Sequence, residues 1–92
     1  MAKFFNTKIQ TPFIQRIYNQ CTSIYACGLN GEFMLFYHHE SFLALLDYRN
    51  IIINIESQKS VSFVSASGLL IYKNISNTCL IIADEVLDNF QI

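Results

Sequence analysis

The dipeptide Asn30-Gly31 is the feature that most constrains what this chain can fold into. It separates two runs of β-type residues, SIYACGL at positions 23–29 and EFMLFYH at positions 32–38. Asn-Gly between such runs is the strongest short-range signal for a β-hairpin, because a two-residue type I′ turn needs positive φ at both of its central residues. The sequence therefore predicts two antiparallel strands joined at Asn30 and Gly31.

Five further segments are predicted as strands. They are residues 3–6, 50–56, 60–66, 69–74 and 79–83. In the second of these, Ile51, Ile53 and Ile55 share one face, as the period of two of a strand requires. A turn at Ser67-Gly68 is expected to join residues 60–66 and 69–74 as a second hairpin.

Three segments instead predict short helices. Thr11 is a good N-cap and Pro12 fits the first helical position, and apolar residues follow at helical spacing as far as Cys21. Ser41 caps residues 42–48, which are apolar nearly all round and are therefore expected to be buried in the core or in a subunit contact. Asp84 caps residues 84–90, with acids in the first turn.

These elements predict an α+β fold. Residues 1–92 are expected to form a single domain, in which two or three short helices pack on a mixed, mostly antiparallel sheet. The first six elements also match a ferredoxin-like core, which is the alternative topology.

Composition and charge limit the kinds of partner that this chain is expected to have. Of the 92 residues, 52% are hydrophobic and 14% are charged, which favours a homodimer that buries apolar surface. The formal net charge of −1 gives no electrostatic case for binding double-stranded DNA. No apolar run approaches the roughly 18 residues of a membrane helix. Cys21, Cys27 and Cys79 have no regular spacing, and we interpret them as reduced, mostly buried thiols of a cytosolic protein.

The adjacent His38 and His39 are the candidates for chemistry. His39 would precede the helix at residues 42–48, where outward-pointing N–H groups favour an anion. An imidazole beside an anion site suits phosphodiester cleavage, with Ser41 or Glu40 helping to position it. The alternative is an ordinary helix cap beside a surface or core histidine. A metal site from Cys27, Cys79 and the two histidines fits no zinc spacing, so no metal and no cofactor are expected.

Two short motifs resemble the viral ring nucleases, anti-CRISPR proteins that degrade cyclic tetra-adenylate. The opening MAKFFNTKIQTPF fits their first strand and turn at Met1, Lys3, Phe5, Thr7 and Thr11. The segment HHESFLALL is similar to their G-H-D-S-like motif before an apolar helix, with His38 in place of the glycine.

The resemblance implies a metal-free reaction in which His39 is the catalytic acid. It implies ligand binding by Thr7, Thr11 and Ser41. Lys8, Lys59 or Lys73 would stand in for basic groups that the family has and this chain lacks. Where the family has a late arginine and then a glutamate, the segment YKNISNTCL has Lys73 and no glutamate. Whether the chain is an enzyme is therefore left open.

Two functions follow from the resemblance. The first is a viral or phage homodimer that antagonises host CRISPR defence in the host cytoplasm, by binding and cleaving cyclic oligoadenylate. The second is a non-enzymatic inhibitor that binds a host defence protein through an apolar face. A structural dimer without chemistry is the third reading of the same residues.

Overall fold

The structure is a computed structural model that describes residues 3–56, 59–66 and 68–88, and in these residues it is all-β. Nine strands form one mixed, mostly antiparallel sheet. They are β1 (Phe5–Gln10), β2 (Gln15–Gly28), β3 (Gly31–Phe36), β4 (Phe42–Leu46), β5 (Asn50–Ile55), β6 (Lys59–Ala66), β7 (Gly68–Lys73), β8 (Thr78–Ile82) and β9 (Glu85–Asp88). A 3-10 turn, η2 (Asn74–Ser76), links β7 to β8.

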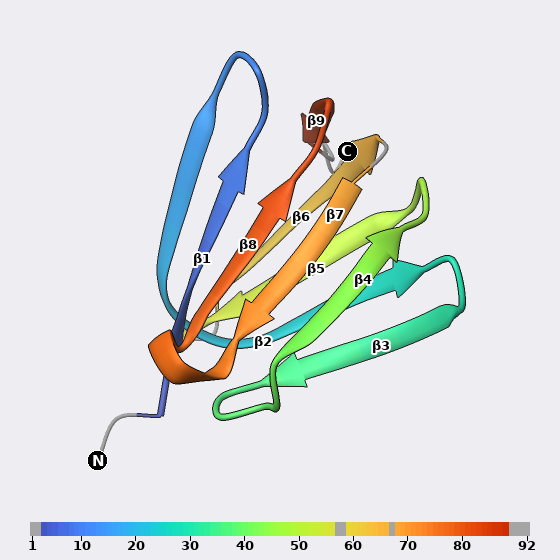
Figure 1. Ribbon diagram of the computed structural model, residues 1–92. Helices are drawn as coiled ribbons and strands as arrows, with labels where there is room; N and C mark the ends of the chain where they lie inside the picture. The colour runs from blue at the N-terminus through green and yellow to red at the C-terminus, as the bar shows by residue number, and fades with distance from the viewer. Residues whose placement is uncertain (1–2, 57–58, 67, 89–92) are drawn as a thin grey trace.

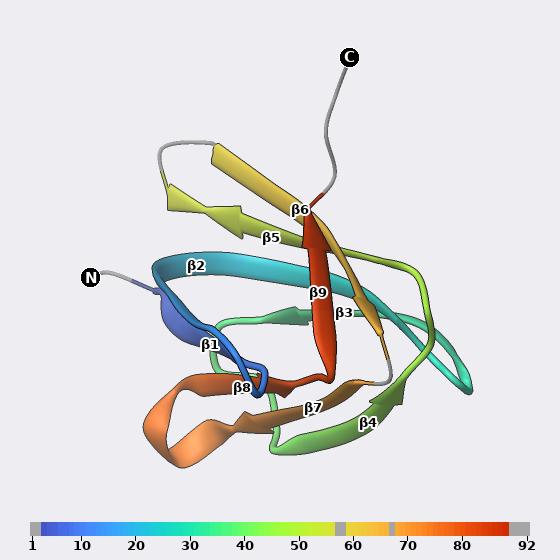
Figure 2. The same ribbon diagram turned by 90° about the horizontal axis from the view of Figure 1, so that it is seen from above.

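The sheet folds over into two layers (Figures 1 and 2). One layer has the order β1-β8-β7-β4, and the other contains β3, β2, β5 and β6, with β9 pairing the edge of β6. The long strand β2 belongs to both layers, because its first half pairs with β1 and its second half with β3 and β5. β1 and β8 pair in parallel, and the remaining pairs are antiparallel.

The core lies between the two layers and follows the alternation along each strand. Its largest fully buried members include Phe5, Ile9, Ile24, Leu35, Ile51, Ile53, Phe63, Leu70, Tyr72 and Ile81. The rings of Phe5 and Tyr72 meet edge to face with centroids 5.6 Å apart. Burying each large apolar side chain contributes about 1.5–3 kcal/mol, so this core is the main source of stability.

The predicted α+β class, and with it the ferredoxin-like alternative, is wrong, and the segment after Thr11 shows why. Thr11 Oγ1 accepts hydrogen bonds from the N–H groups of Phe13 and Ile14, at 3.2 and 3.0 Å, as a helix N-cap would. However, Thr11 N–H donates to the carbonyl of Ile14 at 2.9 Å, which closes a turn between β1 and β2. The hydrogen bonds to Thr11 Oγ1 therefore stabilise the turn of a β-hairpin. The residues that follow form a strand because they pair with β1 and β5.

The other two predicted helices are also strands. Residues 42–46 form β4, because β7 supplies a full ladder from Phe42↔Tyr72 to Leu46↔Gly68. Residues 85–88 form β9 against β6, and residues 89–90 lie outside the described part of the chain. The second predicted hairpin is wrong as well. β6 pairs with β5 and β9, whereas β7 pairs with β4 and β8 in the other layer; Ser67 lies outside the described residues.

The predicted Asn30-Gly31 hairpin is confirmed. Its turn lies one residue earlier than expected, because β2 and β3 pair from Ser23↔Phe36 to Gly28↔Gly31 and leave Leu29 and Asn30 as the turn residues. Gly31 has a φ of 127°, a conformation that favours glycine, whereas Asn30 does not have positive φ. The strands expected at residues 50–56, 60–66, 69–74 and 79–83 are also present, within one or two residues of β5, β6, β7 and β8. The strand expected at residues 3–6 is β1, which begins at Phe5 and runs to Gln10.

Candidate interaction surface

The outer face of β4, β7 and β8 carries two continuous apolar rows. Pairing places Leu43 beside Ile71 and Ile71 beside Leu80, and it places Leu45 beside Leu69 and Leu69 beside Ile82. All six side chains point away from the core, because their strand neighbours Leu46, Leu70, Tyr72, Cys79 and Ile81 are buried. Leu43, Leu45 and Ile82 are 63%, 57% and 43% exposed. We call these six residues the β4–β7–β8 face.

No described element covers the β4–β7–β8 face, which forms the underside of the lower layer in Figure 2. The rows end on β1, where Lys8 pairs with Leu80 and Gln10 with Ile82. An aliphatic surface of this kind, with polar groups at its margin, is typical of a protein contact site. The sequence signal was the nearly all-round apolarity of residues 42–48, but only the register of β4 with β7 and β8 assembles the surface.

The outer face of the opposite layer is more polar. The Asn54 amide donates to Ser23 Oγ at 2.9 Å, and Ser60 Oγ donates to the Asn54 side-chain oxygen at 2.6 Å. Thr22 Oγ1 donates to the Asn54 carbonyl at 3.1 Å. Ile52 lies further along β5 on this face, paired with Ser62 and Tyr25. Met34 and Phe36 of β3 are also exposed on this side, so the face mixes polar and apolar residues, whereas the β4–β7–β8 face is aliphatic.

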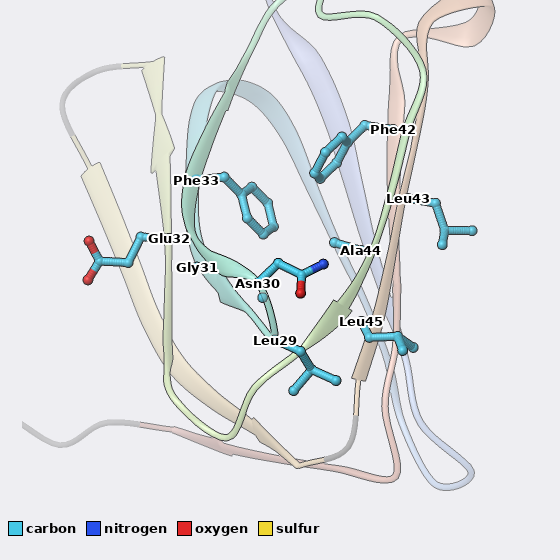
Figure 3. A pocket seen from close by; sticks show the side chains of 10 residues that line it. Leu29, Asn30, Gly31, Glu32, Phe33, Phe42, Leu43, Ala44 and Leu45 are labelled. Atoms are coloured by element: carbon cyan, nitrogen blue, oxygen red, sulfur yellow. The ribbon is translucent and has the colours of Figure 1, made fainter.

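A groove of about 580 Å³ lies between β3 and β4 (Figure 3). Phe33 from β3 and Phe42 from β4 point into the space between the two strands, with ring centroids 5.0 Å apart. Leu29 and Leu45 lie at the end nearer the turn between β2 and β3, and the Glu32 side chain points away from the groove. The groove is mainly apolar.

The predicted catalytic residue His39 lies in the loop between β3 and β4, and no helix follows it. Its Nδ1 is 2.6 Å from the carbonyl oxygen of Glu40, and its ring meets those of Phe42 and Tyr72 edge to face. The Asn74 amide donates to the His39 carbonyl at 2.7 Å. The helix N-terminus that was expected to hold an anion beside His39 is absent from these residues, and the observed contacts fix the loop against η2.

The six predicted ligand-binding residues fall into different surroundings. Thr7 is buried and donates to Cys21 Sγ at 3.4 Å, and the buried Thr11 holds the β1–β2 turn. Ser41 Oγ accepts the Asn74 N–H at 3.1 Å, and Ser41 and Lys73 line the same shallow pocket of 290 Å³. Lys8 lies in β1 and Lys59 in β6, in different layers. The structure brings together only part of this set, and the binding roles stay predictions.

Tyr72 anchors the loop that carries the histidines. Its hydroxyl accepts the His38 N–H at 3.2 Å and donates to the Asn77 side-chain oxygen at 3.1 Å. The pKa of Tyr72 is raised from its usual value, because the effect of burial exceeds the lowering by hydrogen bonds to the backbone at His38 and His39. His38 and Asn77 both have positive φ, at 67° and 51°, so the hydroxyl joins two turns in unusual conformations.

Replacing Tyr72 with phenylalanine is therefore expected to lower the free energy of unfolding by about 1–3 kcal/mol, because His38 N–H and the Asn77 amide lose their partner. Urea titration measures the change. Tyr48→Phe is the control, since Tyr48 is 60% exposed. Equal effects of the two substitutions would show that the Tyr72 hydroxyl does not hold the loop.

The prediction that the cysteines are buried thiols is confirmed, since Cys21, Cys27 and Cys79 are free and buried. Burial raises the pKa of Cys79, and the neighbouring Cys21 raises it further. Among the described residues, no three His, Cys, Asp or Glu side chains gather closely enough to hold a metal ion. In that part of the chain no helix has the length and apolarity to cross a membrane.

The fold is similar to chains in two solved structures of mitochondrial ATP synthases. One belongs to the central stalk and c-ring structure from Tetrahymena thermophila, with a TM-score of 0.75 and 17% identity; the match covers 91% of this chain and 66% of that chain. The other belongs to the OSCP/F1/c-ring structure from Euglena gracilis, with a TM-score of 0.84 and 14% identity; it covers 96% of this chain and 54% of that chain.

This chain therefore spans about half to two thirds of the length of these two chains. No protein-family model matches it, and no curated protein matches it. At such low identity the likeness defines the fold, a two-layered all-β sheet also found in chains of these complexes.

The predicted resemblance to viral ring nucleases is wrong, because the fold is that of chains from ATP synthase structures. The motif matches were short, and the HHES segment leads into β4 rather than a helix. The predictions that depended on the resemblance fall with it. They are the antagonism of CRISPR defence and cyclic oligoadenylate or a host defence protein as partner. The homodimer expected from the composition and the cytoplasmic location expected from the cysteines are corrected as well.

Proposed function

We propose that this chain is a structural component of a mitochondrial ATP synthase, which packs on a neighbouring subunit through the β4–β7–β8 face. The observation that carries the proposal is the pair of uncovered aliphatic rows on that face, from Leu43 to Leu80 and from Leu45 to Ile82. The partners on this proposal are subunits of the central stalk and c-ring assembly, and the location is the mitochondrion.

Two facts support a structural rather than a chemical role. The two solved structures compared above are both of mitochondrial ATP synthases, and one of them is of the central stalk and c-ring. In the described residues, the side chains around His39 are engaged in holding a loop. Apolar surface that remains exposed in the isolated chain is stabilised when a partner removes it from water.

The test compares two isoleucine-to-lysine variants on opposite outer faces. Ile71→Lys places a charge in the centre of the β4–β7–β8 face, whereas Ile52→Lys places the same charge on the other layer. Tagged forms are expressed in the source cells, and the ATP synthase is separated on native gels. We expect wild type and Ile52→Lys to migrate with the complex. We expect Ile71→Lys to be depleted from it by about 10²-fold, because an unpaired buried charge costs several kcal/mol.

Fractionation of the same cells reports where the protein is located. Circular dichroism of the purified variants establishes that both remain folded. Equal incorporation of the two variants would contradict the role of the β4–β7–β8 face. Absence of the wild-type chain from the ATP synthase would contradict the proposed function as a whole.

A further inference from the structure

The edges of β3 and β4 that line the groove are unpaired among the described residues. β3 pairs with β2 alone, and β4 pairs with β7 on its other side. β4 meets β2 at a single position, Gly28↔Leu46, and the two strands diverge from there (Figure 1). Phe33 and Phe42 occupy the space between β3 and β4 and pack against the core. Their rings keep β3 and β4 from pairing with each other.

Neither edge has the features that normally prevent strand addition. β4 reads FLALL, with no charge, proline or glycine, and β3 reads GEFMLF, with Glu32 as its only charge. Natural edge strands are usually protected by lysines, prolines, bulges or a covering element, because an open apolar edge pairs with other chains. An edge that lacks all of these is suited to receive a partner strand.

The main chain of β4 faces the groove at alternate residues. The Leu45 carbonyl accepts the Leu29 N–H at 3.0 Å, so the main-chain groups of Leu45 point away from β7. Groups two residues apart on a strand point to the same side. The N–H and C=O of Leu43 therefore point into the groove, whereas those of Phe42 and Ala44 pair with β7.

We propose that the groove between β3 and β4 binds an extended strand from another polypeptide by β-augmentation on the edge of β4. Main-chain groups of Leu43 and the N–H of Leu45 would supply the hydrogen bonds, and Phe33 and Phe42 the apolar floor. The best segment alternates apolar and polar residues, so that its apolar side chains pack on Phe33 and Phe42. The strand edges carry this proposal independently of the ATP synthase assignment.

The probe is the acetylated, amidated and fluorescently labelled peptide KVTVTVK, titrated against the full chain by anisotropy. We expect saturable binding, and we expect KVTPTVK to bind at least tenfold more weakly because proline removes a ladder donor. Leu43→Pro should also weaken binding of KVTVTVK at least tenfold, since it removes an N–H that faces the groove. Leu43→Ala is the matched control, because it removes the same side chain, keeps the N–H and should retain binding.

Hydrogen exchange on the wild-type protein gives a second readout that does not depend on the folding of a variant. The Leu43 amide should exchange rapidly in the free chain and at least tenfold more slowly with KVTVTVK bound. Three results would each overturn the proposal: no binding of KVTVTVK at millimolar concentration, equal binding of KVTPTVK, or unchanged exchange at Leu43 in the complex.

Discussion

Replacing Leu46 with alanine is expected to lower the free energy of unfolding by about 2–5 kcal/mol, whereas the same change at Leu45 costs less than about 1 kcal/mol. The two leucines are neighbours in β4, but Leu46 is 5% exposed and belongs to the core, and Leu45 is 57% exposed. The difference follows from the alternation of a strand, since only Leu46 leaves a cavity when it is truncated.

Urea unfolding of the wild type and both variants, with a common slope, measures this difference. A helix at residues 42–48 would have been apolar nearly all round, so both leucines would have been expected to lose packing. Similar losses of stability for the two variants would contradict the strand assignment of β4. The result for Leu45 also bears on the β4–β7–β8 face. A side chain that is exposed until a partner covers it contributes little to the free energy of unfolding of the isolated chain.

The stability of the chain is expected to fall steeply as the pH rises above about 9. Burial, and secondarily the proximity of Cys21, raises the pKa of Cys79 from the usual 9.0, and burial also raises that of Cys21. Above pH 9 the unfolded chain therefore loses thiol protons that the folded chain retains. The folded state then binds more protons, and the free energy of unfolding falls by up to about 1.4 kcal/mol per pH unit for each thiol.

Urea titrations from pH 7 to pH 10 in the presence of a reductant measure this slope. The contribution of the thiols should be complete below pH 9 and should be lost progressively above it. Cys79→Ala removes one of the two protons, so the decline between pH 9 and pH 10 should become shallower in this variant. A wild-type stability that stays constant from pH 7 to pH 10 would show that the thiols are not held protonated by the fold.

The β4–β7–β8 face and the groove between β3 and β4 suit different kinds of contact. The β4–β7–β8 face offers side chains and suits the flat packing of a neighbouring subunit, whereas the groove between β3 and β4 offers main-chain groups and suits an extended segment. Leu43 belongs to both, since its side chain lies on the face and its N–H points into the groove. Leu43→Ala and Leu43→Pro therefore separate the two modes of contact.

The sequence by itself determined the local features that need no distant partner. The Asn30-Gly31 signal predicts the hairpin, and Gly31, directly after the turn, adopts the positive φ of 127° that favours glycine. The alternation of Ile51 and Ile53 specifies a strand with one buried face, which the structure confirms. The burial of the three cysteines also follows from their chemistry as small, weakly polar side chains.

Only the tertiary structure decided between helix and strand at residues 11–21, 42–48 and 84–88. These segments carry apolar residues at spacings that fit a helix, and Thr11 makes the same hydrogen bonds in a helix cap and in the β1–β2 turn. The ladders from β1, β7 and β6 resolve the choice, because they satisfy the backbone through residues far away in the sequence.

The candidate surfaces depend on the same distant pairing. The leucines of β4 join Leu69, Ile71, Leu80 and Ile82 in one face only because the register of three strands aligns them. The groove exists because β4 meets β2 only at Gly28↔Leu46, and Phe33 and Phe42 lie between β3 and β4. Local sequence patterns contain neither the register nor the divergence, since both are set by packing across the core.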